Sequence, residues 1–296
     1  MNRNGAASVI AILNPAAGRG AGRTLAPSLA NAFRDAGLRI EVLVTPGPAE
    51  ATRLAAEAAD DGYATVIAAG GDGSANEVAN GLVGTTTALA LYPIGTGNDL
   101  ARSLGYPRRL RDVPAFIAAG RRRVIDVGEL NGRIFVNAAG VGIDGVVAEG
   151  VRGSTRLVGP TLGYLAGALG AIARYRALPM RITIDGEERE GRHLVVVASN
   201  GRYFGGGMQP APRSALDDGW LDITVAGDLG KLATLGALAR LYRGTHVNGT
   251  TIQGVRARSV DIALERPAAI EIDGELLRSA AVAIRVRPGA LAVLTA

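Results

Sequence analysis

The residues with the clearest chemical pattern are glycines around one carboxylate, Gly-Gly-Asp-Gly-Ser at residues 70–74. They follow an apolar run at 64–69 that predicts a buried strand, and they precede a helical run at 76–82. Glycines allow the backbone to approach a polyphosphate closely, and N–H groups at a helix start stabilise its negative charge. Because Asp72 would repel a phosphate directly, the favourable arrangement places Mg²⁺ between them. The alternative is an ordinary strand-to-helix turn in which Asp72 is a cap.

Two further glycine-rich loops could also bind phosphate. The segment Asn-Pro-Ala-Ala-Gly-Arg-Gly at residues 14–20 contains Arg19, whose guanidinium could pair with a phosphate. The segment Gly-Thr-Gly-Asn-Asp at residues 95–99 offers the hydroxyl of Thr96, and Asn98 or Asp99 is expected to cap the next helix. Either segment by itself is equally typical of a plain turn, but three such loops after three strands indicate a phosphate site.

These loops need a parallel sheet to bring them together. Apolar strand-like runs alternate with helical patterns along the first part of the chain: the strands are expected at 8–13, 39–44, 64–69 and 88–92, and the helices at 25–36 and 49–60. This alternation predicts a parallel sheet covered on both faces, in which ligands bind at the carboxyl ends of the strands. The loops after residues 13, 69 and 92 should therefore face one site.

The pattern changes after the arginine cluster at residues 121–123. Many short alternating runs follow, interrupted by helical patterns at 157–178 and 229–242, which is typical of a mostly antiparallel sandwich. We place the domain boundary near residue 128. Residues 182–187 (Ile-Thr-Ile-Asp-Gly-Glu) closely repeat residues 270–275 (Ile-Glu-Ile-Asp-Gly-Glu), and both predict hairpins with Asp-Gly turns.

Composition excludes several classes of protein. Hydrophobic residues make up 48% and charged residues 20% of the 296, which is globular rather than disordered composition. The absence of cysteine excludes disulfides and thiolate metal sites. The net charge of +5 is spread over both halves, so it predicts no nucleic-acid stripe but fits a mild attraction to anionic lipid surfaces.

We expect no secretory signal and no membrane-spanning segment. The N-terminal apolar run is too short for a signal peptide, and the longest apolar stretch, at residues 157–172, contains glycines and Pro160 and is shorter than the ~20 residues that a spanning helix needs. Two common nucleotide motifs are also missing: the Gly-x-x-x-x-Gly-Lys-Ser/Thr loop and a strand-linked Gly-x-Gly-x-x-Gly. A phosphate site here must follow another template.

That template is visible in the order and spacing of the motifs. Residues 14–18, 70–77 and 95–101 resemble the bacterial diacylglycerol kinase and sphingosine kinase-like lipid kinase family, and the likeness continues through residues 216–219 and 272–275. Ser74 stands where the family usually has threonine and keeps the hydroxyl. The resemblance covers essentially the whole chain. It implies an N-terminal three-layer, doubly wound α/β domain of the NAD kinase/diacylglycerol kinase type and a C-terminal β-sandwich-like domain.

The resemblance also assigns roles to individual residues. It implies that ATP is bound by Asn14, Gly18, Arg19, Thr45, Gly70, Gly71, Asp72, Gly73, Ser74, Ala75, Asn76 and Thr96. It implies a magnesium ion held by the side chain of Asp218 and the backbone carbonyls of Ala215 and Trp220, although this acidic turn could otherwise simply be solvated.

Glu275 matches the family's proton acceptor. A lipid alcohol must lose its proton as it attacks the γ-phosphorus, and a positioned carboxylate can accept it. Glu187 has the same local sequence, so only the resemblance selects Glu275. The helical pattern at 157–178 could face lipid, although a core helix fits it better, and we expect structural roles for His193 and His246.

We therefore predict a cytoplasmic, ATP- and Mg²⁺-dependent lipid kinase that acts peripherally at a membrane surface, with diacylglycerol as the favoured substrate and phosphatidic acid as product. Residues 1–128 would bind the nucleotide and residues 129–296 the lipid, with the extreme C-terminus packing back on the first domain. Glu275 and Asp72 would be catalytic. No nucleic acid is expected as a partner, and a homodimer is one permitted state. The alternatives are a NAD kinase-like enzyme and a non-catalytic nucleotide or lipid sensor. The position of Asn76-Glu77 directly after the glycine loop argues against the NAD kinase.

Overall fold

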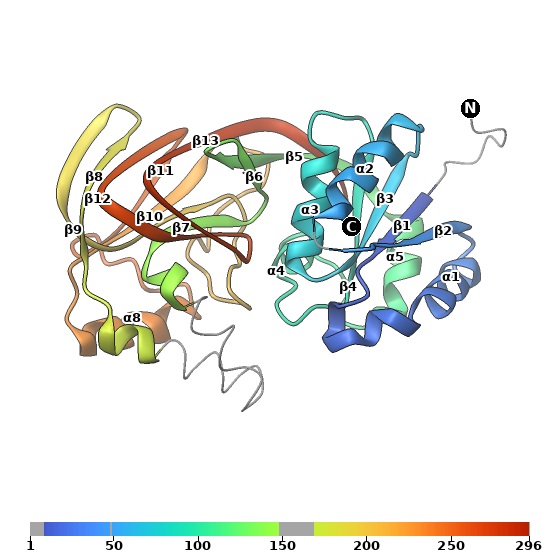
Figure 1. The fold of residues 1–296 in the computed structure, drawn as a ribbon, viewed down its shortest axis with the longest axis horizontal. Helices are drawn as coiled ribbons and strands as arrows, with labels where there is room; N and C mark the ends of the chain where they lie inside the picture. The colour runs from blue at the N-terminus through green and yellow to red at the C-terminus, as the bar shows by residue number, and fades with distance from the viewer. Residues whose placement is uncertain (1–8, 48, 148–168, 296) are drawn as a thin grey trace. The chain divides into compact units, whose positions relative to one another are not determined.

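The computed structural model describes residues 9–47, 49–147 and 169–295, and the chain divides into two compact units (Figure 1). The first unit comprises Met1–Val127 and Pro288–Ala296, and the second comprises Gly128–Arg287. The chain thus leaves the first unit once and returns to it for its last residues.

The first unit contains a parallel sheet with the strand order β4-β3-β1-β2. Its strands are β1 (Val9–Leu13), β2 (Ile40–Val44), β3 (Thr65–Gly70) and β4 (Ala88–Pro93). Every residue of β1 and β3 is buried, which explains why both strands are continuous apolar runs rather than alternating ones. The register pairs Leu13 with Ala69, so the two strands end side by side.

Helices cover both faces of this sheet (Figure 1). The helices are α1 (Ala26–Asp35), α2 (Glu50–Asp60), α3 (Asp72–Leu82), α4 (Asp99–Ser103) and α5 (Val113–Ala119), with short 3₁₀ segments η1 (Ala17–Thr24) and η2 (Leu110–Asp112). A Cβ atom added to Gly81 of α3 would overlap the carbonyl oxygen of Thr52 in α2, so glycine allows these two helices to pack closely. This is the predicted doubly wound arrangement.

The last strand of the chain completes the first unit. Strand β13 (Glu275–Thr295) begins in the second unit, and its end pairs in parallel with β4 through Val293 and Leu89. The hydroxyl of Tyr106 donates to the carbonyl of Leu294 at 3.1 Å. The hydroxyl of Thr295 donates to the carbonyl of Leu104 at 3.0 Å, which ties the strand end to the segment after α4.

The second unit is mostly antiparallel, with the strand order β11-β10-β9-β7-β12-β13 and with β8 paired to β9 and β12. Its elements include β5 (Arg121–Leu130, which enters from the first unit), β6 (Arg133–Phe135), β7 (Ala138–Gly142), β8 (Leu178–Ile184), β9 (Glu187–Ser199), β10 (Leu221–Gly227), α8 (Lys231–Leu241), β11 (Ile252–Ala257) and β12 (Ser259–Ile272). Aliphatic side chains from these strands form its core.

Strands β12 and β13 of the second unit are longer than the short runs that the sequence predicts. Strand β12 has 14 residues and β13 has 21. The register between them shifts between Ala263 and Ala268, which is a bulge-like irregularity. Because a bulge breaks the alternation of inward and outward residues, one long strand looks like two short ones in the sequence.

Both predicted Asp-Gly hairpins are confirmed. Asp185 and Gly186 join β8 to β9 with φ angles of 45° and 90°, and Asp273 and Gly274 join β12 to β13 with φ angles of 44° and 93°. Two consecutive residues with positive φ are the requirement of a type I′ turn, which aspartate and glycine tolerate better than other residues.

The predicted helix at 157–178 lies partly outside the described residues. Helical backbone is present at 143–147 and 169–174, and β8 begins at Leu178, so the helix ends before the predicted limit. In the described part of the chain, no helix combines the length and the apolar character needed to cross a bilayer.

Candidate functional site

The loops after β1 and β3 meet at the carboxyl edge of the first unit's sheet. The Nδ2 atom of Asn14 donates to the Oγ atom of Ser74 at 2.9 Å, and the backbone N–H of Asn14 donates to the carbonyl of Ala69 at 3.0 Å. On the other side of β1, the N–H of Thr45 donates to the carbonyl of Leu13 at 2.9 Å. The loops after β1 and β3 therefore lie side by side at this edge, as the alternation of strands and helices predicts.

The loop after β4 joins the same site. The N–H of Ile94 donates to the carbonyl of Gly70 at 3.0 Å. A Cβ atom added to Gly95 would overlap the Cα atom of Gly71, so the two loops touch through their backbones. This contact requires the absence of a side chain at position 95, which is the close backbone approach that glycine permits.

Asp72 lies at the junction of these loops, in the first turn of α3 rather than in a loop before it. Its Oδ1 atom accepts hydrogen bonds from the backbone N–H groups of Asp99 at 2.6 Å and Leu100 at 3.2 Å. These N–H groups are the first of α4, so Asp72 caps a helix that begins 27 residues later in the chain. Burial raises the pKa of Asp72, while the backbone N–H groups at the α4 start act in the opposite direction.

Asn98 occupies the N-cap position of α4, as predicted, but its side chain makes no capping hydrogen bond. Asn98 has a φ of 52° and its Oδ1 atom accepts from the N–H of Gly95 at 3.0 Å, which braces the preceding turn instead. Asp99 forms an ion pair with Arg102 at 2.8 Å. The physical reason is that the carboxylate of Asp72 already accepts the free N–H groups of α4, while the side chains of Asn98 and Asp99 have other partners.

The remaining predicted ATP-binding residues differ in their accessibility. The Oδ1 atom of Asn76 accepts from Asn80 Nδ2 at 3.0 Å within α3, and Thr45 is buried. Thr96 is exposed at the loop tip, and a Cβ atom added to Gly73 would have no neighbour within 4 Å.

Gly18 has a φ of 59° and lies in η1, where the sequence predicts a loop. Ala75 is buried in α3, and the side chain of Arg19 lies outside the described residues.

Glu275 lies in the second unit at the start of β13, directly after the Asp273-Gly274 turn. Its Oε2 atom is 3.1 Å from the Nη1 atom of Arg133, and 46% of its side chain is exposed. The buried carboxylate of Asp273 accepts from the backbone N–H groups of Val136 at 2.6 Å and Ala138 at 3.0 Å. These bonds anchor the turn, so they set the position of Glu275.

Glu187 occupies the equivalent position in the β8–β9 hairpin. Its side chain is 81% exposed and lies 3.7 Å from Arg189. Asp185 accepts from the N–H of Ser259 at 2.8 Å, in the same way as Asp273 anchors its own turn, but Asp185 is exposed. The two hairpins are thus local copies that differ in burial.

The carboxylate of the acidic turn at residues 215–220 is paired with an arginine in this structure. The carboxylate of Asp218 forms an ion pair with Arg256 and also accepts from the N–H of Trp220 at 3.1 Å. The guanidinium of Arg258 lies 4.5 Å from the centre of the Trp220 ring. A dication at this turn would have to displace Arg256 from the carboxylate of Asp218. The magnesium ion at Asp218, Ala215 and Trp220 therefore stays a prediction.

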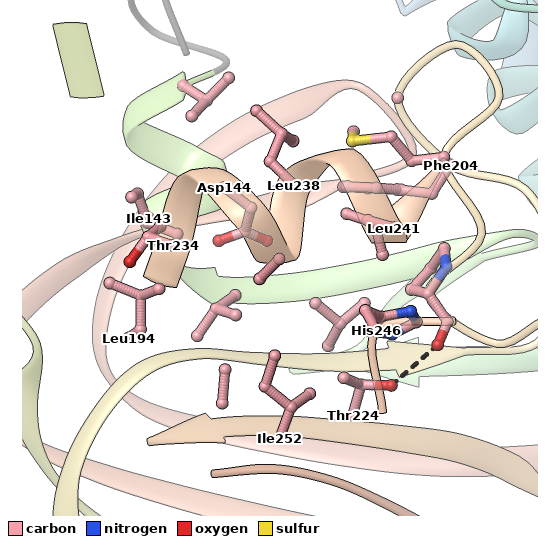
Figure 2. A pocket seen from close by; sticks show the side chains of 18 of the residues that line it. Ile143, Asp144, Leu194, Phe204, Thr224, Thr234, Leu238, Leu241, His246 and Ile252 are labelled. Atoms are coloured by element: carbon pink, nitrogen blue, oxygen red, sulfur yellow. Dashed lines mark hydrogen bonds between the residues drawn. The ribbon is translucent and has the colours of Figure 1, made fainter. Parts of the chain in front are cut away.

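The second unit also contains an apolar cavity of about 190 Å³ (Figure 2). Its wall is formed by the helical residues 143–147 and 169–174, strands β9, β10, β11 and β12, helix α8 with the loop after it, and the loop before β10. Neither Glu275 nor Glu187 lines it. The cavity lies in the half of the chain that the family resemblance assigns to lipid binding, but no sequence pattern identifies the residues that line it.

Asp144 is one of two buried carboxylates in the cavity wall; the other, Glu271 of β12, accepts a hydrogen bond from the N–H of Gly274. Neither carboxylate oxygen of Asp144 accepts a well-formed hydrogen bond from the described residues, and both are buried. Burial raises the pKa of Asp144 to about 7, and the backbone N–H groups of Gly145 and Asp144 oppose this only in part. A Cβ atom at Gly140 would overlap the carboxylate, so the glycine makes room for it. The signal in the sequence was a single carboxylate within the apolar run 138–147.

His246, for which the sequence predicts a structural role, also lines the cavity. Its ring is buried, and neither nitrogen makes a well-formed hydrogen bond to the described residues. Burial lowers the pKa of His246, and a backbone hydrogen bond with Pro210 opposes this only in part. Figure 2 shows Asp144 and His246 as polar side chains among aliphatic ones.

Comparisons with known proteins match both units. Residues 8–130 match the diacylglycerol kinase catalytic domain, and residues 137–295 match the YegS C-terminal NAD kinase beta sandwich-like domain. The chain is 33% identical to a Pseudomonas aeruginosa protein named "Probable lipid kinase YegS-like" over 93% of this chain and 91% of that protein. It is 30% identical to a Bacillus subtilis protein named "Diacylglycerol kinase" over 89% and 88% of the two chains. A crystal structure of a diacylglycerol kinase from Bacillus anthracis matches with a TM-score of 0.76 and 26% identity, covering 99% of this chain and 98% of that one.

Proposed function

The chain belongs to the bacterial diacylglycerol kinase-like lipid kinase family, and on that premise we propose that it transfers the γ-phosphate of ATP to a hydroxyl group of diacylglycerol. The observation that carries the proposal is the meeting of three glycine-rich loops at one sheet edge, held by the Asn14–Ser74 bond and by the bonds from Asp72 to α4. Catalysis of phosphoryl transfer consists mainly of positioning and charge stabilisation, and these loops suit both tasks.

The first unit would bind ATP. The N–H groups at the start of α3 and the open backbone at Gly73 allow close approach of the phosphates. Mg²⁺ bound with ATP would neutralise charge on the transferred phosphoryl group. Asp72 fits such an ion because its hydrogen bonds to α4 are made through Oδ1 and hold the carboxylate at the loop junction, where it would contact the ion directly or through water.

The second unit would bind the lipid acceptor. Its cavity is lined mainly by aliphatic side chains, which suits an acyl chain. Glu275 would accept the proton of the attacking hydroxyl, as a carboxylate in an anchored turn can do. The buried carboxyl of Asp144 would recognise a polar group of the lipid, because a polar side chain without a partner in an apolar wall costs free energy unless a ligand supplies the partner.

Asp144 provides a prediction about pH dependence. Its pKa is raised from 3.8 to about 7, so the folded state binds more protons than the unfolded state between these values. The contribution of this carboxyl to the free energy of unfolding is therefore greatest at low pH, and it is lost as the pH rises through about 7. We expect the free energy of unfolding of wild type to fall by about 3 kcal/mol between pH 5 and pH 8 relative to that of Asp144→Asn. Urea unfolding at both pH values checks this, and identical pH profiles would show that the carboxyl is not desolvated.

The experiment that tests the proposed function is transfer of labelled γ-phosphate from ATP and Mg²⁺ to a panel of acceptors. The panel contains diacylglycerol, phosphatidylglycerol, a sphingoid base and NAD. Label in diacylglycerol is the expected result. Label in another lipid would change the substrate, label in NAD would indicate a NAD kinase, and ATP binding without transfer to any acceptor would indicate a non-catalytic protein.

A further inference from the structure

Helix α8 (Lys231–Leu241) separates the apolar cavity from solvent. Its inner face contributes Thr234, Ala237, Leu238 and Leu241 to the cavity wall (Figure 2). Thr234 satisfies its hydroxyl within the helix by donating to the carbonyl of Gly230 at 3.1 Å, so the inner face presents little polarity to the cavity. A lipid chain in the cavity would therefore contact α8 directly.

The outer face of α8 is also apolar. The side chain of Leu232 is 87% exposed and that of Leu235 is 43% exposed, and Tyr242 directly after the helix is 44% exposed. A helix with apolar residues on both faces is normally buried on both. Because large apolar side chains in water forgo the stabilisation of burial, this exposed group indicates a surface that is covered when the protein acts.

Cations surround these apolar residues. Lys231, Arg240 and Arg243 are exposed, and the chain from residue 229 to residue 260 contains no aspartate or glutamate. Lys231 donates to the carbonyl of Tyr175, while Arg240 and Arg243 form no ion pair within the described ranges. Apolar side chains flanked by unneutralised cations are the composition of a helix that lies in the interface of an anionic membrane.

We propose that the α8 face, defined as Lys231, Leu232, Leu235, Arg240, Tyr242 and Arg243, docks on an anionic lipid bilayer and brings the cavity to the membrane surface. The inference rests on the proposed function, because it assumes that the cavity receives a membrane lipid. A single helix face offers far less than the roughly 800 Å² per partner of a stable protein interface. A bilayer needs only insertion of the leucines and attraction of the cations, so it is the partner that this face fits.

The test is sedimentation of the purified full chain with vesicles. Vesicles of phosphatidylglycerol mixed with phosphatidylcholine should bind the protein, and vesicles of phosphatidylcholine alone should bind it less. The double variant Leu232→Glu/Leu235→Glu should weaken binding about tenfold or more, because it replaces inserting side chains by anions. Arg240→Glu/Arg243→Glu should weaken binding about tenfold to the anionic vesicles only.

Val124→Glu is the matched control. It adds one negative charge, half of that added by the leucine double variant, at an apolar side chain that is 51% exposed in the first unit, and we expect unchanged binding. Circular dichroism and the melting temperature show that each variant is folded. Equal binding by wild type and both double variants would overturn the proposal. So would a change in oligomeric state of the leucine variant without vesicles, which would indicate that a second copy of the chain covers this face.

A second readout separates this inference from the proposed function. Phosphorylation of a short-chain, water-dispersed diacylglycerol should be unchanged in the α8 variants, because the substituted side chains lie outside the cavity. If the short-chain substrate is phosphorylated and the α8 variants bind vesicles as well as wild type, the docking surface alone is overturned. Vesicle binding that depends on α8 without phosphorylation of any lipid would overturn the proposed function alone.

Discussion

Replacing Glu275 by glutamine should lower lipid phosphorylation by about 100-fold or more while ATP binding persists. Glutamine keeps the size of the side chain but cannot accept a proton, and loss of a positioned general base lowers rates by about 10²–10⁴-fold. The variant also loses the ion pair with Arg133, but that pair is about half exposed and contributes little to stability. The measurement is the initial rate of phosphate transfer together with ATP affinity of the same preparation.

Glu187→Gln is a matched control for this experiment. Glu187 follows an Asp-Gly turn of the same type, and its side chain is more exposed than that of Glu275. We expect a rate within about twofold of wild type, because surface substitutions away from a site have small effects. A large loss in Glu187→Gln with a normal rate in Glu275→Gln would reverse the assignment of the base.

Removal of the Asp72 charge should have a comparable effect on activity. Asp72→Asn keeps an oxygen that can accept the N–H groups of Asp99 and Leu100, so α4 stays capped while the negative charge is lost. Because burial raises the pKa of Asp72, its ionised form carries a desolvation cost, and the asparagine variant should be at least as stable as wild type at pH 7. If Asp72 organises Mg²⁺ and the phosphates, phosphate transfer should fall about 100-fold.

Asp72→Ala separates the two roles of this residue. Alanine removes both the charge and the cap, so we expect the same loss of activity and an additional loss of about 1 kcal/mol in unfolding free energy. Urea denaturation and phosphate transfer are measured on both variants. Full activity in Asp72→Asn, with destabilisation only in Asp72→Ala, would show that Asp72 serves solely to hold α4 against α3.

Local sequence patterns predicted much of the fold. The alternation of apolar strands and helices in the first half predicts the parallel sheet, because each strand is a buried apolar run closed by a loop. The Asp-Gly pairs at 185–186 and 273–274 predict both hairpins, because few residues tolerate two consecutive positive φ angles. The loops after β1, β3 and β4 were predicted to meet because parallel strands end at one edge.

The sequence by itself therefore determined the types of element, the three loops and, through their order and spacing, the lipid kinase family. Tertiary structure alone decided which groups are partners. Asp72 caps α4 across 27 intervening residues, Arg256 neutralises Asp218, and Asp144 is buried in the wall of a cavity. These contacts join residues far apart in the chain. Short-range sequence patterns cannot predict them, because the same turn or strand forms whichever distant side chain packs against it.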